Sequence, residues 1–398
     1  MAFAFGVVLF ALGIAISIAL HEAGHMVTAK AFGMRVRRYY IGFGPKIFSF
    51  RRGETEYGMK WIPAGGFCDI AGMTALDEVT EEERPRAFFR KPTWQRVVVL
   101  SAGSATHFLI GIILIYVLAL TSGLPNVSDT PTAGQISCAA NQTSPSALEP
   151  CGPGVAAPAA DAGLRSGDTI VSVAGTPTPT WTDAVKLIQA ADGPTPIVVE
   201  RGGERLTLTM DVTKVQRLDP QTGAAREVGA IGVSQQLIFA YDPLTAVPAT
   251  FAYTGQMFAQ VWQGLMMFPE KVPRLIDAIS GGERDLETPV SVVGASVIGG
   301  DLAERGLWQV FVQLLVVLNL FVGVFNLLPL LPLDGGHIAV NLYERVRDWV
   351  RAKLGKVQMP PVDYTKLLPL TYVVILIGGA ISLLTLTADI VNPIRPFQ

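Results

Sequence analysis

The residues best suited to do chemistry are His21, Glu22 and His25, which form the pattern H-E-x-x-H near the N-terminus. On a helix, positions i and i+4 lie on one face, so both imidazoles can bind a single zinc ion. Glu22 projects about 100° away from His21, where its carboxylate can hold a water molecule beside the metal without being a ligand. The pattern predicts metal-assisted hydrolysis of peptide bonds.

The segment before this pattern indicates where that chemistry takes place. Residues 2–20 carry no charge, so the helix that contains the motif begins as a membrane span. A signal peptide is disfavoured, because the segment lacks a charged N-terminal region and no cleavage site is evident. Ionisable side chains inside spans are costly and are functional by default. We therefore favour hydrolysis inside or at the edge of a membrane over an accidental match.

A catalytic zinc ion takes three protein ligands and a water molecule, so the motif needs a third ligand. The candidate is Asp334, the first charged residue after the uncharged segment 306–333. Pro329 should break the helix just before it, and Asn326 adds an amide at the same level. The alternative is that Asp334 only marks the end of a span. Both motifs lie near the C-terminal ends of spans that run in the same direction, so they reach the same depth, which favours a ligand.

Composition identifies a membrane protein. The chain has 398 residues, of which 50% are hydrophobic and 16% are charged, whereas about 25% are charged in soluble domains. Four uncharged segments are long enough to cross a bilayer: 2–20, 97–120, 306–333 and 367–388. The net charge of −2 gives no sign of nucleic-acid binding, so we expect the lipid bilayer and no nucleic acid as partner.

Basic residues predict the orientation. The connection between the first two spans holds thirteen Lys or Arg, and the connection between the last two holds six. By the positive-inside rule both connections are cytoplasmic, so both termini and residues 123–305 lie outside. Cys138 and Cys151 fall in that external segment, where a disulfide can persist, whereas Cys68 lies in a cytoplasmic connection.

The first cytoplasmic connection contains a predicted hairpin. Residues 46–50 and 56–62 have the pattern of two short strands around a turn at Gly53. The preceding Gly42-Phe43-Gly44 suits a tight loop that dips back toward the bilayer, and an ordinary loop is the alternative.

The external segment contains one predicted module. Residues 123–158 have the composition of a linker. Strands and one amphipathic helix follow, at 169–173, 181–191 (the helix), 197–201 and 206–212. The run Ala-Gly-Leu-x-x-Gly-Asp at 162–168 resembles PDZ domains, which bind peptide tails by adding them to a sheet edge. Residues 244–280 predict an amphipathic helix that lies on the outer membrane surface or packs against the module.

In their order along the chain, these features resemble the site-2 proteases, and among them the bacterial regulator-of-sigma-E type with one external PDZ domain. The resemblance covers nearly the whole length and rests on His21-Glu22-x-x-His25, Gly42-Phe43-Gly44, the second span, the PDZ module, Asn326-x-x-Pro329 and Leu333-Asp334-Gly335. It implies Zn²⁺ bound by His21, His25 and Asp334, with Glu22 as catalytic base. It also implies cleavage of single-span membrane proteins such as anti-sigma factors, and a membrane-associated sheet that binds the substrate as an added strand.

One position departs from the family pattern. Where the second span of the family reads Gly-Pro-x-x-Asn-Phe, this chain reads Gly-Ser-Ala-Thr-His-Phe, with His107 in place of the asparagine. A neutral imidazole has one donor and one acceptor, so His107 can replace the amide beside the substrate oxyanion. Asn326 and Pro329 are the other candidates on this side of the site. One alternative is that His107 is a fourth zinc ligand in a resting state, in the position that water needs for catalysis. The other is that it only hydrogen bonds a neighbouring helix.

We therefore predict a mostly α-helical polytopic membrane protein with four transmembrane helices, a membrane-associated β-hairpin and an extracytoplasmic α/β PDZ domain. The first half of the membrane core is expected at 1–122, with spans at about 2–32 and 94–122 and a β-loop at 40–70. A linker at 123–158, the PDZ domain at 159–235 and an amphipathic region at 236–305 should follow. The second half of the core is expected at 306–398, with spans at about 306–333 and 367–390.

The expected location is the inner or plasma membrane, with the PDZ domain and both termini outside and the active site near the cytoplasm. The expected function is intramembrane zinc-dependent proteolysis in regulated intramembrane proteolysis. The alternative is a catalytically inactive, PDZ-bearing membrane scaffold or chaperone. Because Glu22 and all three candidate ligands are present, we favour the enzyme.

Overall fold

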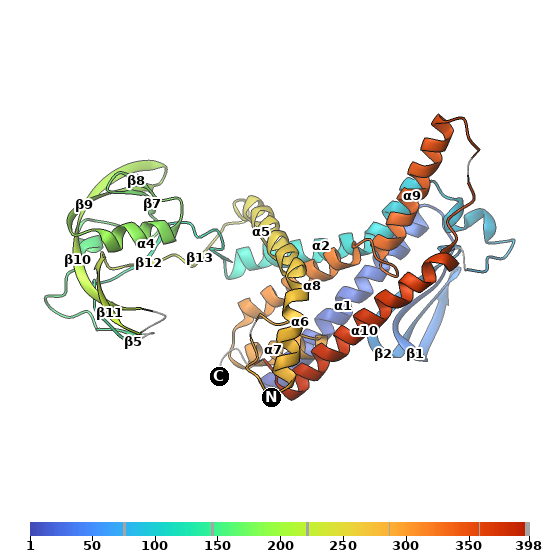
Figure 1. The fold of residues 1–398 in the computed structure, drawn as a ribbon, viewed down its shortest axis with the longest axis horizontal. Coiled ribbons are helices and arrows are strands. Elements are labelled where there is room, and N and C mark those ends of the chain that lie inside the picture. The colour runs from blue at the N-terminus through green and yellow to red at the C-terminus, as the bar shows by residue number, and fades with distance from the viewer. Residues whose placement is uncertain (75–76, 145–146, 220–222, 286, 358, 395–398) are drawn as a thin grey trace. The chain divides into compact units, whose positions relative to one another are not determined.

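The chain folds into two compact units. The computed structural model describes residues 1–74, 77–144, 147–219, 223–285, 287–357 and 359–394. The helical unit comprises Met1–Leu118 and Thr245–Gln398, and the β unit comprises Ala119–Leu244. Figure 1 gives the order of the elements in both units.

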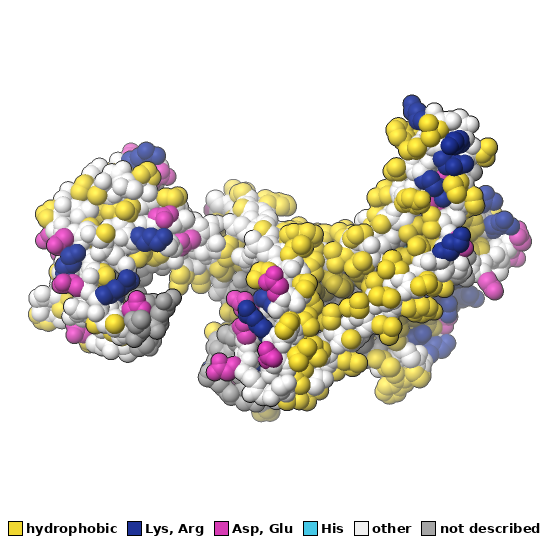
Figure 2. Space-filling view, viewed as in Figure 1, with side chains coloured by type: hydrophobic (Ala, Val, Ile, Leu, Met, Phe, Trp, Pro, Cys, Tyr) yellow, Lys and Arg dark blue, Asp and Glu magenta, His cyan; other side chains and the backbone are white. Residues whose placement is uncertain are grey.

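The four predicted spans are confirmed as helices that are long and apolar enough to cross a membrane. They are α1 (Ala2–Ala31), α2 (Thr93–Thr121), α8 (Trp308–Asn326) and α10 (Leu368–Val391). Hydrophobic side chains cover much of the visible face of the helical unit (Figure 2). The third span is shorter than predicted, because α8 ends three residues before Pro329, and a new helix, α9 (Asp334–Lys353), begins after the proline-containing turn.

Three further helices occupy the predicted amphipathic region, namely α5 (Ala246–Met266), α6 (Phe268–Ile279) and α7 (Val292–Glu304). Small residues bring α7 against α1: a Cβ added at Gly6 would lie 2.5 Å from the Cβ of Ala303. The core between α1, α7 and α8 is formed by Phe10, Ile14, Ala295, Leu302 and Phe311. This packing fixes the N-terminal half of the helix that carries the H-E-x-x-H motif.

The predicted hairpin is confirmed and is longer than expected. Strands β1 (Val36–Arg52) and β2 (Thr55–Ile70) pair in antiparallel fashion around Gly53. The prediction of a loop at Gly42-Phe43-Gly44 is wrong, since these residues lie inside β1. Gly42 and Gly44 have φ of +89° and +83°, and the register shifts between Ile41 and Lys46. The two glycines therefore form an irregular bulge in β1. Their positive φ angles are a conformation that residues with a side chain rarely adopt.

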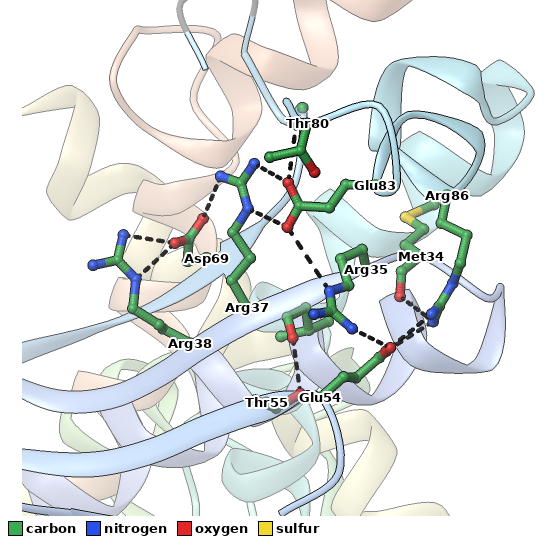
Figure 3. A network of polar contacts seen from close by, with 12 residues as sticks. Met34, Arg35, Arg37, Arg38, Glu54, Thr55, Asp69, Thr80, Glu83 and Arg86 are labelled. Atoms are coloured by element: carbon green, nitrogen blue, oxygen red, sulfur yellow. Dashed lines mark hydrogen bonds and ion pairs between the residues drawn. The ribbon is translucent and has the colours of Figure 1, made fainter. Parts of the chain in front are cut away.

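Ion pairs fix the base of this hairpin (Figure 3). Arg37 donates two hydrogen bonds to Glu83, at 2.9 and 2.7 Å, and Arg86 donates two to Glu54, at 2.6 and 2.7 Å. Hydrogen bonds from Arg86 and then Arg35 lower the pKa of Glu54 to about 2, and those from Arg37 lower the pKa of Glu83 to about 2. The network ties the strand ends to the segment that follows β2.

The β unit is built on a five-stranded sheet with the order β11-β10-β9-β7-β8. Its strands are β7 (Thr169–Val173), β8 (Thr176–Pro177), β9 (Gly193–Arg201), β10 (Glu204–Leu218) and β11 (Ala225–Ala230). Helix α4 (Trp181–Ala190) contributes Ala184 and Ile188 to the core. The predicted strands and helix of this module are confirmed, with β9 and β10 extending beyond the predicted ends.

The prediction that residues 123–158 are only a linker is wrong. They contain β3 (Leu124–Pro125), β4 (Ala133–Ile136), β5 (Gln142–Ser144), β6 (Ala147–Leu148) and the start of α3 (Pro158–Asp161). Strand β4 pairs with β12 (Val233–Gln235), and β3 pairs with β13 (Ile238–Phe239). A disulfide joins Cys138 to Cys151. The segment thus belongs to the β unit.

Candidate active site

Two helices that are far apart in sequence bring three candidate ligands together. His21 and His25 come from α1, and Asp334 comes from the first turn of α9. The Nε2 atoms of the two histidines are 3.2 Å apart, and each is 3.4 Å from Oδ2 of Asp334. Tetrahedral ligands at the usual zinc distance of about 2.0–2.1 Å are about 3.3 Å from one another. The triangle of donor atoms therefore has the size that a zinc ion requires.

Helix α2 orients the histidines and leaves room between them. Nδ1 of His25 lies 2.7 Å from the carbonyl oxygen of Val99, and a carbonyl only accepts, so Nδ1 carries the proton and Nε2 is free as a ligand atom. A Cβ added at Gly103 would lie 2.5 Å from Nε2 of His25 and 2.6 Å from Nε2 of His21. Only glycine at this position keeps the space beside both donor atoms open.

The turn between α8 and α9 positions Asp334. A Cβ at Gly335 would lie 2.2 Å from the carbonyl oxygen of Leu327, and a Cβ at Gly336 would lie 2.5 Å from the backbone nitrogen of Leu331. The two glycines therefore allow the start of α9 to pack directly on the preceding turn. A carboxylate in the first turn is also stabilised by the free N–H groups of the helix.

Glu22 lies next to the hairpin and outside the triangle of ligand atoms. A Cβ at Gly66 of β2 would lie 3.0 Å from Cγ of Glu22. One turn earlier on α1, the carbonyl oxygen of Ala19 accepts a hydrogen bond of 2.7 Å from the hydroxyl of Tyr39 in β1. The hairpin thus packs against the same part of α1 that carries the H-E-x-x-H motif.

His107 lies beside the cluster and is hydrogen bonded to Asn319 of α8. Its ring centroid is 5.1 Å from that of His21, and its Nδ1 is 2.9 Å from Oδ1 of Asn319. Nδ2 of Asn319 donates to the carbonyl oxygen of Leu315 at 2.9 Å, which fixes the amide. The Nδ1 of His107 therefore carries its proton, and Nε2 of the neutral ring is an acceptor. This geometry favours the interhelical link over the predicted role as an oxyanion donor.

Asn319 was not predicted, although an amide inside an apolar span is itself a signal. It precedes Asn326 by seven residues, or about two helical turns. Asn326 is the last residue of α8, and Pro329 lies in the turn that follows. Within the described part of the chain, neither is hydrogen bonded to the histidine cluster. His337 also lies apart from it, with its ring stacked on Tyr364.

Comparison with known proteins places the chain in a family. Residues 9–359 match the profile of peptidase family M50. The chain is 50% identical to the zinc metalloprotease Rip1 of Mycobacterium tuberculosis over 407 aligned residues, and 49% identical to that of Mycolicibacterium smegmatis over 409, with 100% of both chains covered in each case. A putative zinc metalloprotease of Mesorhizobium japonicum is 30% identical over 340 residues, which cover 80% of this chain and 83% of that protein.

These relatives confirm the prediction of a zinc metalloprotease, and the four apolar helices identify it as a multi-pass membrane protein. The chain belongs to peptidase family M50, the site-2 proteases, which are intramembrane zinc metalloproteases.

Proposed function

We propose that His21, His25 and Asp334 bind the zinc ion and that Glu22 is the catalytic base for cleavage of single-span membrane proteins of the anti-sigma-factor kind. The proposal rests on the triangle of donor atoms, whose edges of 3.2, 3.4 and 3.4 Å fit tetrahedral zinc. The proton on Nδ1 of His25 supports it, because that tautomer leaves Nε2 available.

The reaction follows from the chemistry of these groups. Zinc bound here supplies a Lewis acid that polarises the scissile carbonyl and makes a water molecule more acidic. Glu22 accepts the proton of the attacking water and returns it to the leaving amine nitrogen. Asn326 remains the candidate donor to the oxyanion, since within the described residues its amide has no hydrogen bond. Pro329 would hold the turn that presents it.

The hairpin is proposed to hold the unwound substrate. Within the described residues, 46–52 of β1 and 66–70 of β2 each pair with a strand on one side only, whereas 38–41 pair on both sides. An extended peptide can add to such a free edge. The bulge at Gly42-Phe43-Gly44 and the contact of Gly66 with Glu22 support this role, because they set the hairpin against the catalytic base. Phe43 is half exposed and can contact an apolar substrate.

The β unit is proposed to be an extracytoplasmic PDZ domain that controls access by binding peptide tails. In support, a pocket of about 210 Å³ lies between α4 (Trp181, Val185 and Ile188) and residues 231–234. The positive-inside rule places both termini on the same side as this unit and the active site near the cytoplasm of an inner or plasma membrane. Replacement of the whole β unit, residues 123–244, by a short linker should leave the chemistry intact and admit substrates with larger external domains.

The decisive experiment compares Glu22→Gln with Asp334→Ala in purified protein reconstituted with a panel of single-span substrates. Glu22→Gln should abolish cleavage and retain zinc, because the carboxylate is outside the ligand triangle. Asp334→Ala should lose cleavage and most of the zinc. Chelation should inactivate the wild type. Cleavage by Glu22→Gln at the wild-type rate would exclude the proposed base, and would favour a different group in that role.

A further inference from the structure

We propose that α9 carries a binding surface for anionic lipid headgroups, next to the spans and continuous with the helix that supplies Asp334. Helix α9 is amphipathic, but its charged residues exclude it from the helices that can cross a membrane. Figure 1 shows its C-terminal half standing apart from the other helices of the helical unit. The other described helices therefore leave one side of this half of α9 exposed, and a molecule other than this chain can bind there.

An apolar stripe runs along the exposed side of this helix. It consists of Leu342, Val346, Trp349 and Val350, which are 47, 59, 57 and 42% exposed. Their spacing of i, i+4, i+7 and i+8 places them on one face. Tryptophan at such a position is typical of the boundary between hydrocarbon and headgroups. The stripe is thus suited to the edge of a bilayer.

The charges near the stripe are predominantly positive, and Arg351 donates a hydrogen bond of 2.8 Å to the carbonyl oxygen of Val357. Within the described residues, no carboxylate pairs with Arg345, Arg351, Lys353 or Lys356. The two acidic side chains nearby are already engaged: Glu344 lies 3.6 Å from Arg96 and accepts a hydrogen bond from the backbone of Val362, and Asp348 pairs with Arg347 at 3.0 Å. Figure 2 shows Lys and Arg side chains among hydrophobic ones at the free end of α9.

The depth of the helix agrees with a headgroup contact. Asp334 begins α9 beside His21, which lies about 30 Å along α1 and so near the inner boundary of the hydrocarbon. The stripe begins eight residues further on, about 12 Å along the helix axis. That distance carries it into the headgroup layer, where each basic residue near an anionic surface strengthens binding by about fivefold.

This surface would also act on catalysis, an inference that rests on the proposed role of Asp334 as a ligand. The carboxylate and the stripe belong to one continuous helix, so lipid bound to the stripe restrains the start of α9. We therefore expect anionic lipid to raise turnover by stabilising the complete set of three ligands.

Photo-crosslinking tests the surface itself. A benzophenone amino acid is placed at Val346 in the full chain, which is reconstituted in nanodiscs of mixed phosphatidylcholine and phosphatidylglycerol. We expect the ratio of phosphatidylglycerol to phosphatidylcholine adducts to exceed the ratio of these lipids in the disc by about fivefold or more. The triple variant R345Q/K353Q/K356Q should bring the adduct ratio down to the lipid ratio in the disc. The control position is Leu376 in the apolar span α10, which is 71% exposed and should capture lipids at the bulk composition.

Adducts at Val346 that are exclusively protein, whether a second copy or another chain, would overturn the proposal. So would lipid adducts with no more phosphatidylglycerol than at Leu376. Turnover is then compared in discs with and without phosphatidylglycerol. It should rise severalfold with the anionic lipid in the wild type and stay constant in the triple variant, and equal rates in both lipids would exclude the effect on catalysis. Crosslinking needs no activity, so failure of the proposed metal site would leave its result unchanged.

Discussion

The substitution Gly103→Ala tests whether the space beside the two histidines is the metal site. The added Cβ would lie 2.5 Å from Nε2 of His25 and 2.6 Å from Nε2 of His21. Non-bonded carbon contacts settle at about 3.5 Å, so each donor atom must retreat by about 1 Å. His25 cannot turn away freely, because that would break the hydrogen bond between its Nδ1 and the carbonyl oxygen of Val99.

The size of the effect follows from this displacement. Metal–ligand distances tolerate about 0.2 Å, so a shift of about 1 Å removes at least one good ligand. We expect zinc affinity to fall by about 10- to 100-fold or more, and the cleavage rate by about 10²-fold even at saturating zinc. The loss in folding free energy should stay at about 1–3 kcal/mol, as for other overpacked positions.

The assay combines three measurements on purified protein: zinc content after dialysis against a weak chelator, cleavage of a reconstituted single-span substrate, and thermal unfolding. Gly111→Ala in the same helix is the matched control. Its added Cβ would meet the end of the flexible Leu320 side chain at 2.9 Å, so zinc and turnover should stay near normal. Wild-type zinc affinity and turnover in Gly103→Ala would refute the assignment of this space to the metal.

Three more predictions concern other parts of the chain. His107→Ala should leave Oδ1 of Asn319 without a donor and destabilise the protein by about 1–3 kcal/mol with zinc content unchanged. Adding Asn319→Leu should recover much of that loss in thermal unfolding. A rate loss of about 10²-fold that persists in the double variant would instead make His107 an oxyanion group. Mass spectrometry of protein from an oxidising compartment should find Cys138 and Cys151 joined, and their replacement by serine should cost about 3 kcal/mol; two free thiols would contradict this. The pKa of Glu54 is lowered from 4.5 to about 2 in the folded state, so its ion pairs stabilise the hairpin fully above about pH 4.5. This stabilisation, about 1 kcal/mol after solvent screening, is lost as the pH falls toward 2. Hydrogen exchange in the hairpin should show this pH dependence in the wild type and not in Glu54→Gln.

The membrane core and the three candidate ligands could be predicted because each depends on a short sequence pattern or on the direction in which a span crosses the membrane. H-E-x-x-H specifies two ligands on one helical face, and the uncharged segment before Asp334 shows that this residue ends a span. Two spans that run the same way must bring their C-terminal ends to the same depth. Chain direction therefore indicated that the end of α1 and the start of α9 could meet, and the structure brings their side chains together.

The parts that could not be predicted depend on contacts between distant residues. Strand β4 pairs with β12, almost 100 residues away in sequence, so the composition of residues 123–158 reads as a linker when taken alone. The hydrogen bond between His107 and Asn319 joins two spans. Each polar side chain is a signal in its own span, but neither identifies the other as its partner. The small residues at 101–105 of the second span suit close packing of another helix. Only the folded structure shows that Gly103 faces both histidines.

Because Asp334 lies in the second half of the chain, the ribosome adds it long after the two histidines. On the proposed ligand set, a nascent chain that has inserted α1 and α2 carries both histidines and Glu22 but only two of the three metal-binding groups. The third appears at residue 334 of 398, after the β unit has been made. Translation therefore delays proteolytic competence until most of the polypeptide exists. During insertion, the growing enzyme cannot cut the helices of its neighbours or its own unfinished spans.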